Sequence, residues 1–119
     1  MHKYDIILYA SNDEKREKGL MFTKPLNKDE CALFSFPRVA DHAFWNKNVS
    51  YPLDLVFCNA NNEVIAIKHM EAGSTKSCRA NNANVKYVIE TMKGAAADIK
   101  IGDALIIEND GEKLYFINK

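Results

Sequence analysis

The chain has 119 residues and 47% hydrophobic content, and its 16 lysine and arginine residues balance 16 aspartate and glutamate residues. This length fits one domain over residues 1–119, and a chain of this size buries about 65 to 70% of its unfolded surface on folding. The balanced charge shows no clustering of positive residues, which argues against a nucleic-acid partner.

The N-terminal region and the cysteines indicate where the protein resides. The apolar run IILYA is much shorter than a membrane span of about 20 residues or a signal-peptide core of about 7 to 15. The three cysteines, Cys31, Cys58 and Cys78, are widely spaced and contain no CxxC pair. An odd number at this spacing favours reduced thiols over a disulfide framework. We therefore expect a soluble, cytoplasmic protein without a membrane partner.

The first predicted elements are a strand and a short helix. Residues 3–9 alternate weakly and are rich in β-branched and aromatic side chains, which predicts a strand. Ser11 stands three residues before Glu14, the spacing of a reciprocal N-terminal helix cap, and Gly19 is suited to end the helix in a left-handed conformation. We expect a helix of about two turns between them.

The middle of the chain predicts three strands. Residues 31–36, CALFSF, are typical of a buried strand, and we expect Pro37 to end it because proline cannot donate to a sheet ladder. Residues 53–58 are apolar on both faces, as in a strand that is covered twice. The run Asn59-Ala60-Asn61-Asn62 predicts a turn, and residues 63–69 then return as the second arm of a hairpin.

The last third of the chain begins with its longest expected loop. Residues 73–84 are polar and have no period, and a small helix is expected over residues 95–100. The pair Asp110-Gly111 supplies the positive φ angles of a tight hairpin turn. The strands expected in this region are 85–92, 104–108 and 113–117.

These elements define a mainly β fold of about seven strands and two short helices. No predicted helix is long enough to cross between parallel neighbours. We therefore expect a mainly antiparallel sandwich or a partly closed barrel, with the helices as appendages.

The segment FWNKN at residues 44–48 can be interpreted in two ways. If it is extended, Trp45 and Lys47 point to one face and the other three residues to the opposite face. In the first interpretation this is ordinary packing, with Trp45 in the core and Lys47 over its ring in a cation–π contact of about 0.5 to 1 kcal/mol. In the second, the indole face forms part of a mostly apolar cleft with a few polar groups, among them Asn48 and Asp54.

Asp54 stands one residue inside a strand whose neighbours are apolar. A carboxylate there is costly unless it is paired or hydrogen-bonded. Lys47, Arg79 or Lys86 could supply the partner. Capping of a turn through backbone N–H groups and a role as a general base both remain open for this residue.

Five segments together resemble a known family: GLM at 19–21, ALFSF, FWNKN, PLDLVF and YVIETMKGAAADIKIGD. In this order, over about Gly19 to Asp103, they resemble the family called domain of unknown function 192. The resemblance implies a compact mainly β domain, similar to a jelly-roll-like sandwich, with no established activity. Asn46 stands where the family usually has Met, and Cys31-Ala32 where Gly-Met is common. The signature positions that carry over are Gly19, Leu20, Met21, Phe34, Phe44, Trp45, Lys47, Asn48, Pro52, Leu53, Asp54, Glu90 and Gly94.

Several chemistries lack support in the sequence. His2, His42 and His69 are isolated, and no His or Cys pair has metal-ligand spacing, so we expect no metal site. There is no nucleotide-binding fingerprint, so we expect no cofactor. Cys78, beside Arg79, is the only candidate for a reactive thiol.

Three functions remain, and all place the site at Trp45, Lys47, Asn48, Asp54 and Glu90 or near a sheet edge. The first is a binding module for a small polar ligand such as a saccharide. The second is an accessory module that docks a protein partner through a sheet edge or the polar loop. The third is a hydrolytic enzyme with Asp54 or Glu90 as general base and Lys47 stabilising negative charge. We expect the first, with no catalytic residue, in a monomer or a weak homodimer.

Overall fold

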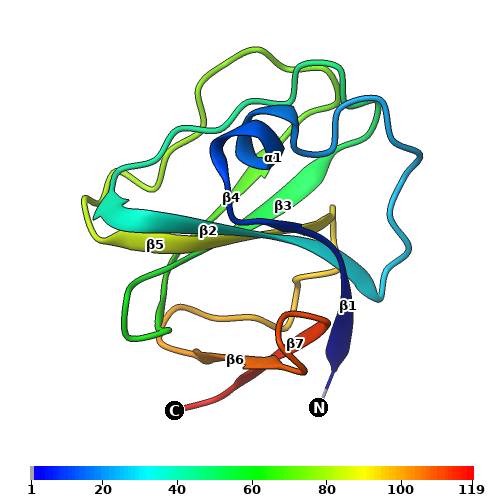
Figure 1. Cartoon of the computed structure of the whole chain (residues 1–119). Helices are drawn as coiled ribbons and strands as arrows, with labels where there is room; N and C mark the ends of the chain where they lie inside the picture. The colour runs from blue at the N-terminus through cyan, green and yellow to red at the C-terminus, as the bar shows by residue number, and fades with distance from the viewer. Residues whose placement is uncertain (1) are drawn as a thin grey trace.

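The structure, a computed structural model that describes residues 2–119, contains seven strands and one helix (Figure 1). The seven strands expected from turn residues and apolar patterns are all present. Their bounds are β1 (Lys3–Ala10), β2 (Glu30–Ala40), β3 (Leu53–Cys58), β4 (Val64–Met70), β5 (Val85–Met92), β6 (Ala104–Glu108) and β7 (Lys113–Ile117). The helix is α1 (Asp13–Lys18).

All seven strands belong to one sheet, in the order β4-β3-β5-β2-β1-β7-β6. The pair β1 and β2 is parallel, and the other neighbours are antiparallel, so the sheet is mixed. The sheet is thus mainly antiparallel, as expected, but the sequence did not predict the parallel pair, because no predicted helix was long enough to connect parallel neighbours. Residues 11–29, which include α1, supply the crossover of a dozen or more residues that a parallel pair requires.

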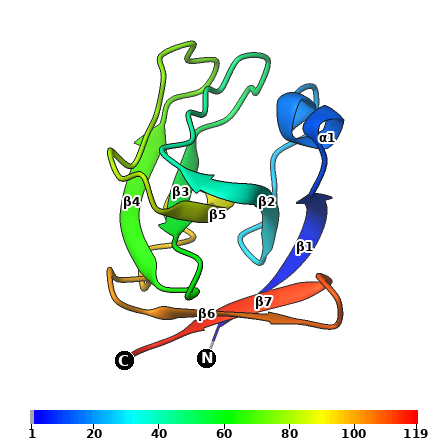
Figure 2. The ribbon, with the colours of Figure 1, turned by 60° about the vertical axis from the view of Figure 1, so that its left-hand side comes forward.

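The sheet curls so that its two edge strands, β4 and β6, meet at one end (Figure 2). The Val64 N–H donates to the Asp103 carbonyl at 2.9 Å, and the Leu105 N–H donates to the Asn62 carbonyl at 2.7 Å. The result is a half-barrel, which agrees with the expected partly closed barrel. The jelly-roll-like sandwich is not confirmed.

Two apolar clusters cover the two faces of the central strands. Phe34, Leu55 and Phe57 belong to the cluster on the side of α1 and the long loops. Val56 and Ile89 belong to the cluster on the side of β6 and β7. Figures 1 and 2 show α1 on one side of β2 and β5, with β6 and β7 on the other. All six residues of β3 are buried, as its apolar pattern predicted.

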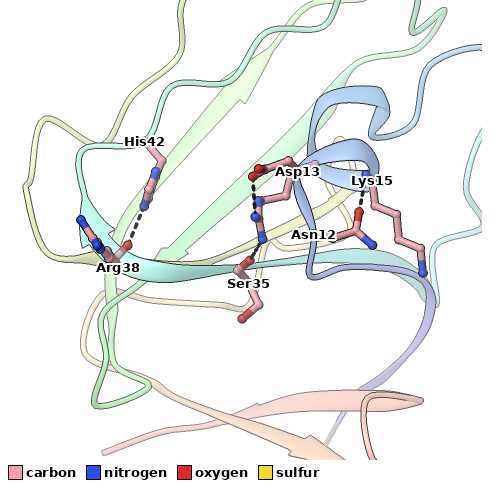
Figure 3. Close-up of polar contacts among 7 residues, drawn as sticks. Asn12, Asp13, Lys15, Ser35, Arg38 and His42 are labelled. Atoms are coloured by element: carbon pink, nitrogen blue, oxygen red, sulfur yellow. Dashed lines mark hydrogen bonds and ion pairs between the residues drawn. The ribbon is translucent and has the colours of Figure 1, made fainter.

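The helix begins one residue later than the sequence suggested. Asn12, and not Ser11, is the N-cap, and its Oδ1 accepts a hydrogen bond from the Lys15 N–H at 2.8 Å (Figure 3). Asn and Ser are comparably good N-cap residues. Because Ser11 and Asn12 are adjacent, propensity alone does not decide which of them begins the helix. Gly19 ends the helix at φ 49°, and its N–H donates to the Lys15 carbonyl.

Two further expectations are wrong. Strand β2 does not end at Pro37 but continues to Ala40. Its pairing with β5 shifts register between Ser35 and Ala40, so the N–H group that proline lacks falls in an interrupted part of the ladder.

The second predicted helix, over residues 95–100, is a series of turns. Its backbone hydrogen bonds span three residues, as from the Ala97 N–H to the Gly94 carbonyl and from the Ile99 N–H to the Ala96 carbonyl. An α-helix needs bonds that span four. Alanine propensity is a weak signal that the surrounding sheet overrides here.

No helix within residues 2–119 has the length and apolar character needed to cross a membrane.

Candidate functional site

A pocket of about 390 Å³ lies on the α1 side of the sheet. Its walls come from α1 and the following turn, from β2, and from the loop around residues 43–49, and Glu90 of β5 also lines it. The aromatic residues in its lining are Phe34, Phe36, Phe44 and Trp45. Such a mostly apolar pocket with a few polar groups is typical of a small-molecule site.

Glu90 is the most unusual group in this lining. It is 4% exposed, and its neighbours across the sheet are Ala32 on β2 and Leu55 on β3. Burial raises the pKa of the Glu90 carboxyl to about 8, with no charge or hydrogen bond among residues 2–119 offsetting it. At neutral pH the group is therefore mostly a protonated acid, which can both donate and accept a hydrogen bond.

Trp45 and Lys47 lie together at the same pocket. The Lys47 Nζ is 5.2 Å from the centroid of the Trp45 ring, which is the expected cation–π contact. Trp45 is nevertheless 47% exposed and does not fill the core. Of the two interpretations of FWNKN, the structure supports an exposed indole beside a concave surface.

Asn46, between them, is fully buried. Its Nδ2 donates to the carbonyls of Tyr51 and Glu71, at 2.9 and 3.0 Å, and so joins two segments of the surrounding loops. Among the described residues, its Oδ1 is the one side-chain polar atom that is completely inaccessible to solvent and has no hydrogen-bond partner. An unpaired buried acceptor of this kind is rare and calls for a structural or functional explanation.

Arg16 of α1 fixes the helix against the sheet. Its guanidinium group donates to the Ser35 carbonyl at 2.7 Å and to the Asp13 carboxylate at 2.8 Å. Figure 3 labels both partners, Ser35 and Asp13. It also lies 5.4 Å from the centroid of the Phe36 ring, on which His42 stacks at 3.6 Å. These contacts hold one wall of the pocket in place.

The other two predicted site residues lie outside this pocket lining. Asn48 occupies a turn at φ 61°, and its carbonyl accepts from the Phe22 N–H at 2.9 Å. Asp54 pairs with Thr91, whereas Leu55 pairs with Glu90, so Asp54 and Glu90 point to opposite faces of the sheet.

Asp54 has structural partners of its own. Its Oδ1 is 2.6 Å from the His69 Nδ1, and its Oδ2 accepts from the Gly94 N–H at 2.8 Å. None of the three cations considered from sequence is its partner. The carboxylate thus joins β3 to β4 and to the turn after β5.

We expect Asp54→Ala to lower the free energy of unfolding by about 1 to 3 kcal/mol, because the hydrogen bonds of this buried carboxylate with the Gly94 N–H and the His69 ring are lost. Chemical denaturation measures this change. The exposed Asp98→Ala, at a position without a positive φ angle, serves as a control with little effect. A loss below about 0.5 kcal/mol in Asp54→Ala would contradict the anchoring role.

Cys78 is a weak nucleophile in this fold. Burial raises its pKa, and the nearby Lys68 only partly offsets that effect. Burial also raises the pKa values of Cys31 and Cys58. All three thiols are free in this structure.

Sequence reasoning missed the contribution of α1 and the GLM turn to the pocket. Arg16, Lys18, Leu20 and Met21 all line it, although only the last two belong to a recognised motif. The sequence signal for this wall was the GLM motif at residues 19–21. In the structure, Gly19 of this motif lies close to Phe34. A Cβ atom added to this glycine would be 3.4 Å from the Phe34 ring.

The chain belongs to the family of domain of unknown function 192, described as "Uncharacterized ACR", whose model matches residues 2–107. This confirms the resemblance drawn from the sequence motifs. No curated protein matches the chain.

Two solved structures share the fold. A protein of unknown function from Novosphingobium aromaticivorans DSM 12444 is 28% identical, with a TM-score of 0.76 over 81% of this chain and 70% of the other. A Sinorhizobium meliloti 1021 protein described as a "putative transcription regulator" is 24% identical, with a TM-score of 0.77 over 91% of this chain and 78% of the other. The second likeness, at 24% identity, concerns the fold alone.

The exposure of Trp45 leads to a stability prediction. We expect Trp45→Ala to cost about 1 kcal/mol or less, whereas Phe57→Ala, at a fully buried position, should cost about 3 to 5 kcal/mol. Urea denaturation of the two variants measures the difference. Equal losses would show that Trp45 is a core residue.

Proposed function

We propose that this protein is a binding module for a small polar ligand, saccharide-like in character, that enters the pocket between Trp45 and Glu90. The observation that carries the proposal is the Glu90 carboxyl group, which belongs to a residue only 4% exposed, lines the pocket and forms no side-chain hydrogen bond or ion pair within residues 2–119. Burying a polar group without a partner costs free energy. A ligand that forms hydrogen bonds with Glu90 would offset this cost, and would explain why a carboxyl group lies at a position where an apolar side chain would favour folding.

The surroundings of Glu90 fit such a ligand. The exposed indole of Trp45 offers an apolar face on which a sugar ring can lie. Lys47 adds hydrogen-bond donors beside that face. Asn48 and Asp54 support the loop and the sheet around the pocket in this proposal.

Hydrolysis is a second candidate, and the raised pKa of Glu90 favours it. A carboxyl that titrates at about 8 holds or accepts a proton near neutral pH, as general acid–base catalysis requires. Asp54 is less suited to this role, because it faces the opposite side of the sheet and is bonded to His69 and Gly94. We rank binding first because the other carboxyl group in the described pocket lining is Glu17, which lies at an exposed position of α1.

Protein docking through a sheet edge has less support. The two edge strands, β4 and β6, meet at one end, where backbone hydrogen bonds join Val64 to Asp103 and Asn62 to Leu105. At that end, these bonds use backbone groups that strand addition would need.

The proposal is tested with the intrinsic fluorescence of Trp45, which is the only tryptophan. Emission is followed while neutral sugars, nucleosides and short peptides are added, and affinities are then measured by calorimetry. We expect a sugar to shift the emission and Trp45→Ala to weaken its binding at least tenfold. Phe22→Ala removes an exposed aromatic residue outside the pocket lining and should leave affinity unchanged. The absence of binding to any sugar would overturn the proposal.

A further inference from the structure

We infer that the ligand is an acidic saccharide, a sugar whose ring lies on Trp45 and whose carboxylate is held by Lys18, Lys47 and Glu90. This inference rests on the proposed function and names the ligand class of the same pocket. Its basis is the distribution of charged groups in the lining, which favours an anion.

Positively charged side chains outnumber negatively charged ones at the pocket, and two of them have no ion-pair partner among the described residues. Lys18 and Lys47 line it, and neither forms an ion pair within residues 2–119. Arg16 also lines it, but Asp13 already pairs with this cation at 2.8 Å. Glu17 is the one exposed acid in the lining. Two free ammonium groups against one free carboxylate give a surplus of positive charge, which attracts an anionic ligand.

Glu90 does not cancel this surplus, because it is mostly uncharged at neutral pH. A protonated carboxyl group donates a hydrogen bond, and a ligand carboxylate is a strong acceptor for it. An ionised Glu90 would instead repel the same carboxylate. Ligand affinity should therefore decrease as Glu90 loses its proton.

The groups that face Glu90 from neighbouring elements do not supply a competing charge. Ala32 on β2 and Leu55 on β3 are apolar. Tyr51 and Cys78, in the loops before β3 and before β5, are close enough to interact with Glu90 electrostatically. Burial raises the pKa of both, so they remain mostly neutral at pH 7.

A basic sugar fits less well. Its ammonium group could pair with an ionised Glu90 but would lie near Lys18 and Lys47. A neutral sugar could use Trp45 but would leave both ammonium groups without a partner. An acidic sugar uses the ring face and the cations together.

The experiment compares glucuronate, glucose and glucosamine by calorimetry on the whole protein at pH 6.5. We expect glucuronate to bind at least tenfold more tightly than glucose, and glucosamine to bind most weakly. Lys47→Met keeps an apolar stem over Trp45 and should reduce the preference for glucuronate severalfold. Lys100→Met, at an exposed position outside the pocket lining, should leave the preference unchanged.

Repeating the titration at pH 9 measures how much the protonated form of Glu90 contributes to glucuronate binding. Wild-type affinity for glucuronate should fall about tenfold, because about a tenth of a group that titrates near 8 keeps its proton at that pH. Glu90→Gln keeps a neutral donor and should bind glucuronate equally at both pH values, so it also separates Glu90 from any other titrating group.

The outcomes distinguish the two proposals. If glucose or glucosamine binds as tightly as glucuronate, the acidic-saccharide inference is wrong while the binding pocket stands. If Glu90→Gln shows the same pH dependence as wild type, the role of Glu90 in holding the carboxylate is wrong. If none of the three sugars binds and the wider panel also fails, both proposals are overturned.

Discussion

Replacing Glu90 with glutamine is expected to raise the free energy of unfolding at pH 7 by about 2 to 3 kcal/mol. Glutamine has nearly the same size and is neutral at every pH. The wild-type chain, in contrast, must hold a proton on Glu90 in the folded state that the unfolded state has already lost. Urea denaturation at a series of pH values measures the effect.

The direction follows from the two pKa values of this carboxyl. It titrates near 4.5 when solvated, and burial raises its pKa to about 8 in the folded protein. The folded state therefore binds more protons between these values. The contribution of Glu90 to the free energy of unfolding is therefore greatest below pH 4.5. It falls by up to about 1.4 kcal/mol per pH unit as the pH rises to 8. Glu90→Gln should remove this slope.

Glu17→Gln is the matched control, because it makes the same chemical change at an exposed position of the pocket lining. We expect it to alter stability by less than about 0.5 kcal/mol. If Glu90→Gln instead lowers stability at pH 7, the Glu90 carboxylate is ionised and paired in the folded protein, contrary to the structure.

The second large effect is expected at Gly111, in the turn between β6 and β7. This residue has φ 93°, and a Cβ atom added there would be 2.2 Å from the nearest ring atom of Tyr9 on β1. Gly111→Ala should therefore combine backbone strain with overpacking and lower the free energy of unfolding by about 2 to 5 kcal/mol. Thermal and urea denaturation measure the loss.

Gly102→Ala separates the two contributions. Gly102 has φ 97°, but a Cβ atom added there would meet nothing within 4 Å. Its replacement should cost about 1 to 2 kcal/mol from backbone strain alone. If both substitutions cost the same, the close packing of the turn against Tyr9 does not contribute to stability.

The strands could be predicted because their signals are local. Asn62, Asn109 and Asp110 have φ values between 53° and 62°, which is the conformation that asparagine and aspartate tolerate at turns. The apolar run of β3 likewise predicted a strand that is buried throughout. Turn residues and apolar periodicity need no knowledge of distant contacts.

The pairing of the strands could not be predicted in the same way. The parallel contact of β1 with β2 depends on residues 11–29 folding as a crossover, and the half-barrel depends on bonds between Val64 and Asp103. These contacts join residues that are far apart in sequence. The turns over residues 95–100 are a similar case, because the Tyr4 hydroxyl, from the other end of the chain, donates to the Ala95 carbonyl.

The candidate site was predicted in part, for a related reason. Trp45 and Lys47 are two residues apart, so extended geometry placed them on one face from sequence alone. Glu90 joins them in the pocket lining only because β5 lies beside β2 in the sheet. Asp54 does not, because the register sets Leu55, and not Asp54, opposite Glu90.

The most direct test of this account is the titration of Glu90 itself. Carbon-13 NMR of a glutamate-labelled protein follows the carboxyl carbon from pH 4 to pH 10, with Glu90→Gln assigning the signal. An unpaired, buried carboxyl in the pocket predicts a midpoint near pH 8. A midpoint near 4.5, the value of a solvated carboxyl, would mean that Glu90 is hydrated or paired, and the site proposed for this pocket would be contradicted.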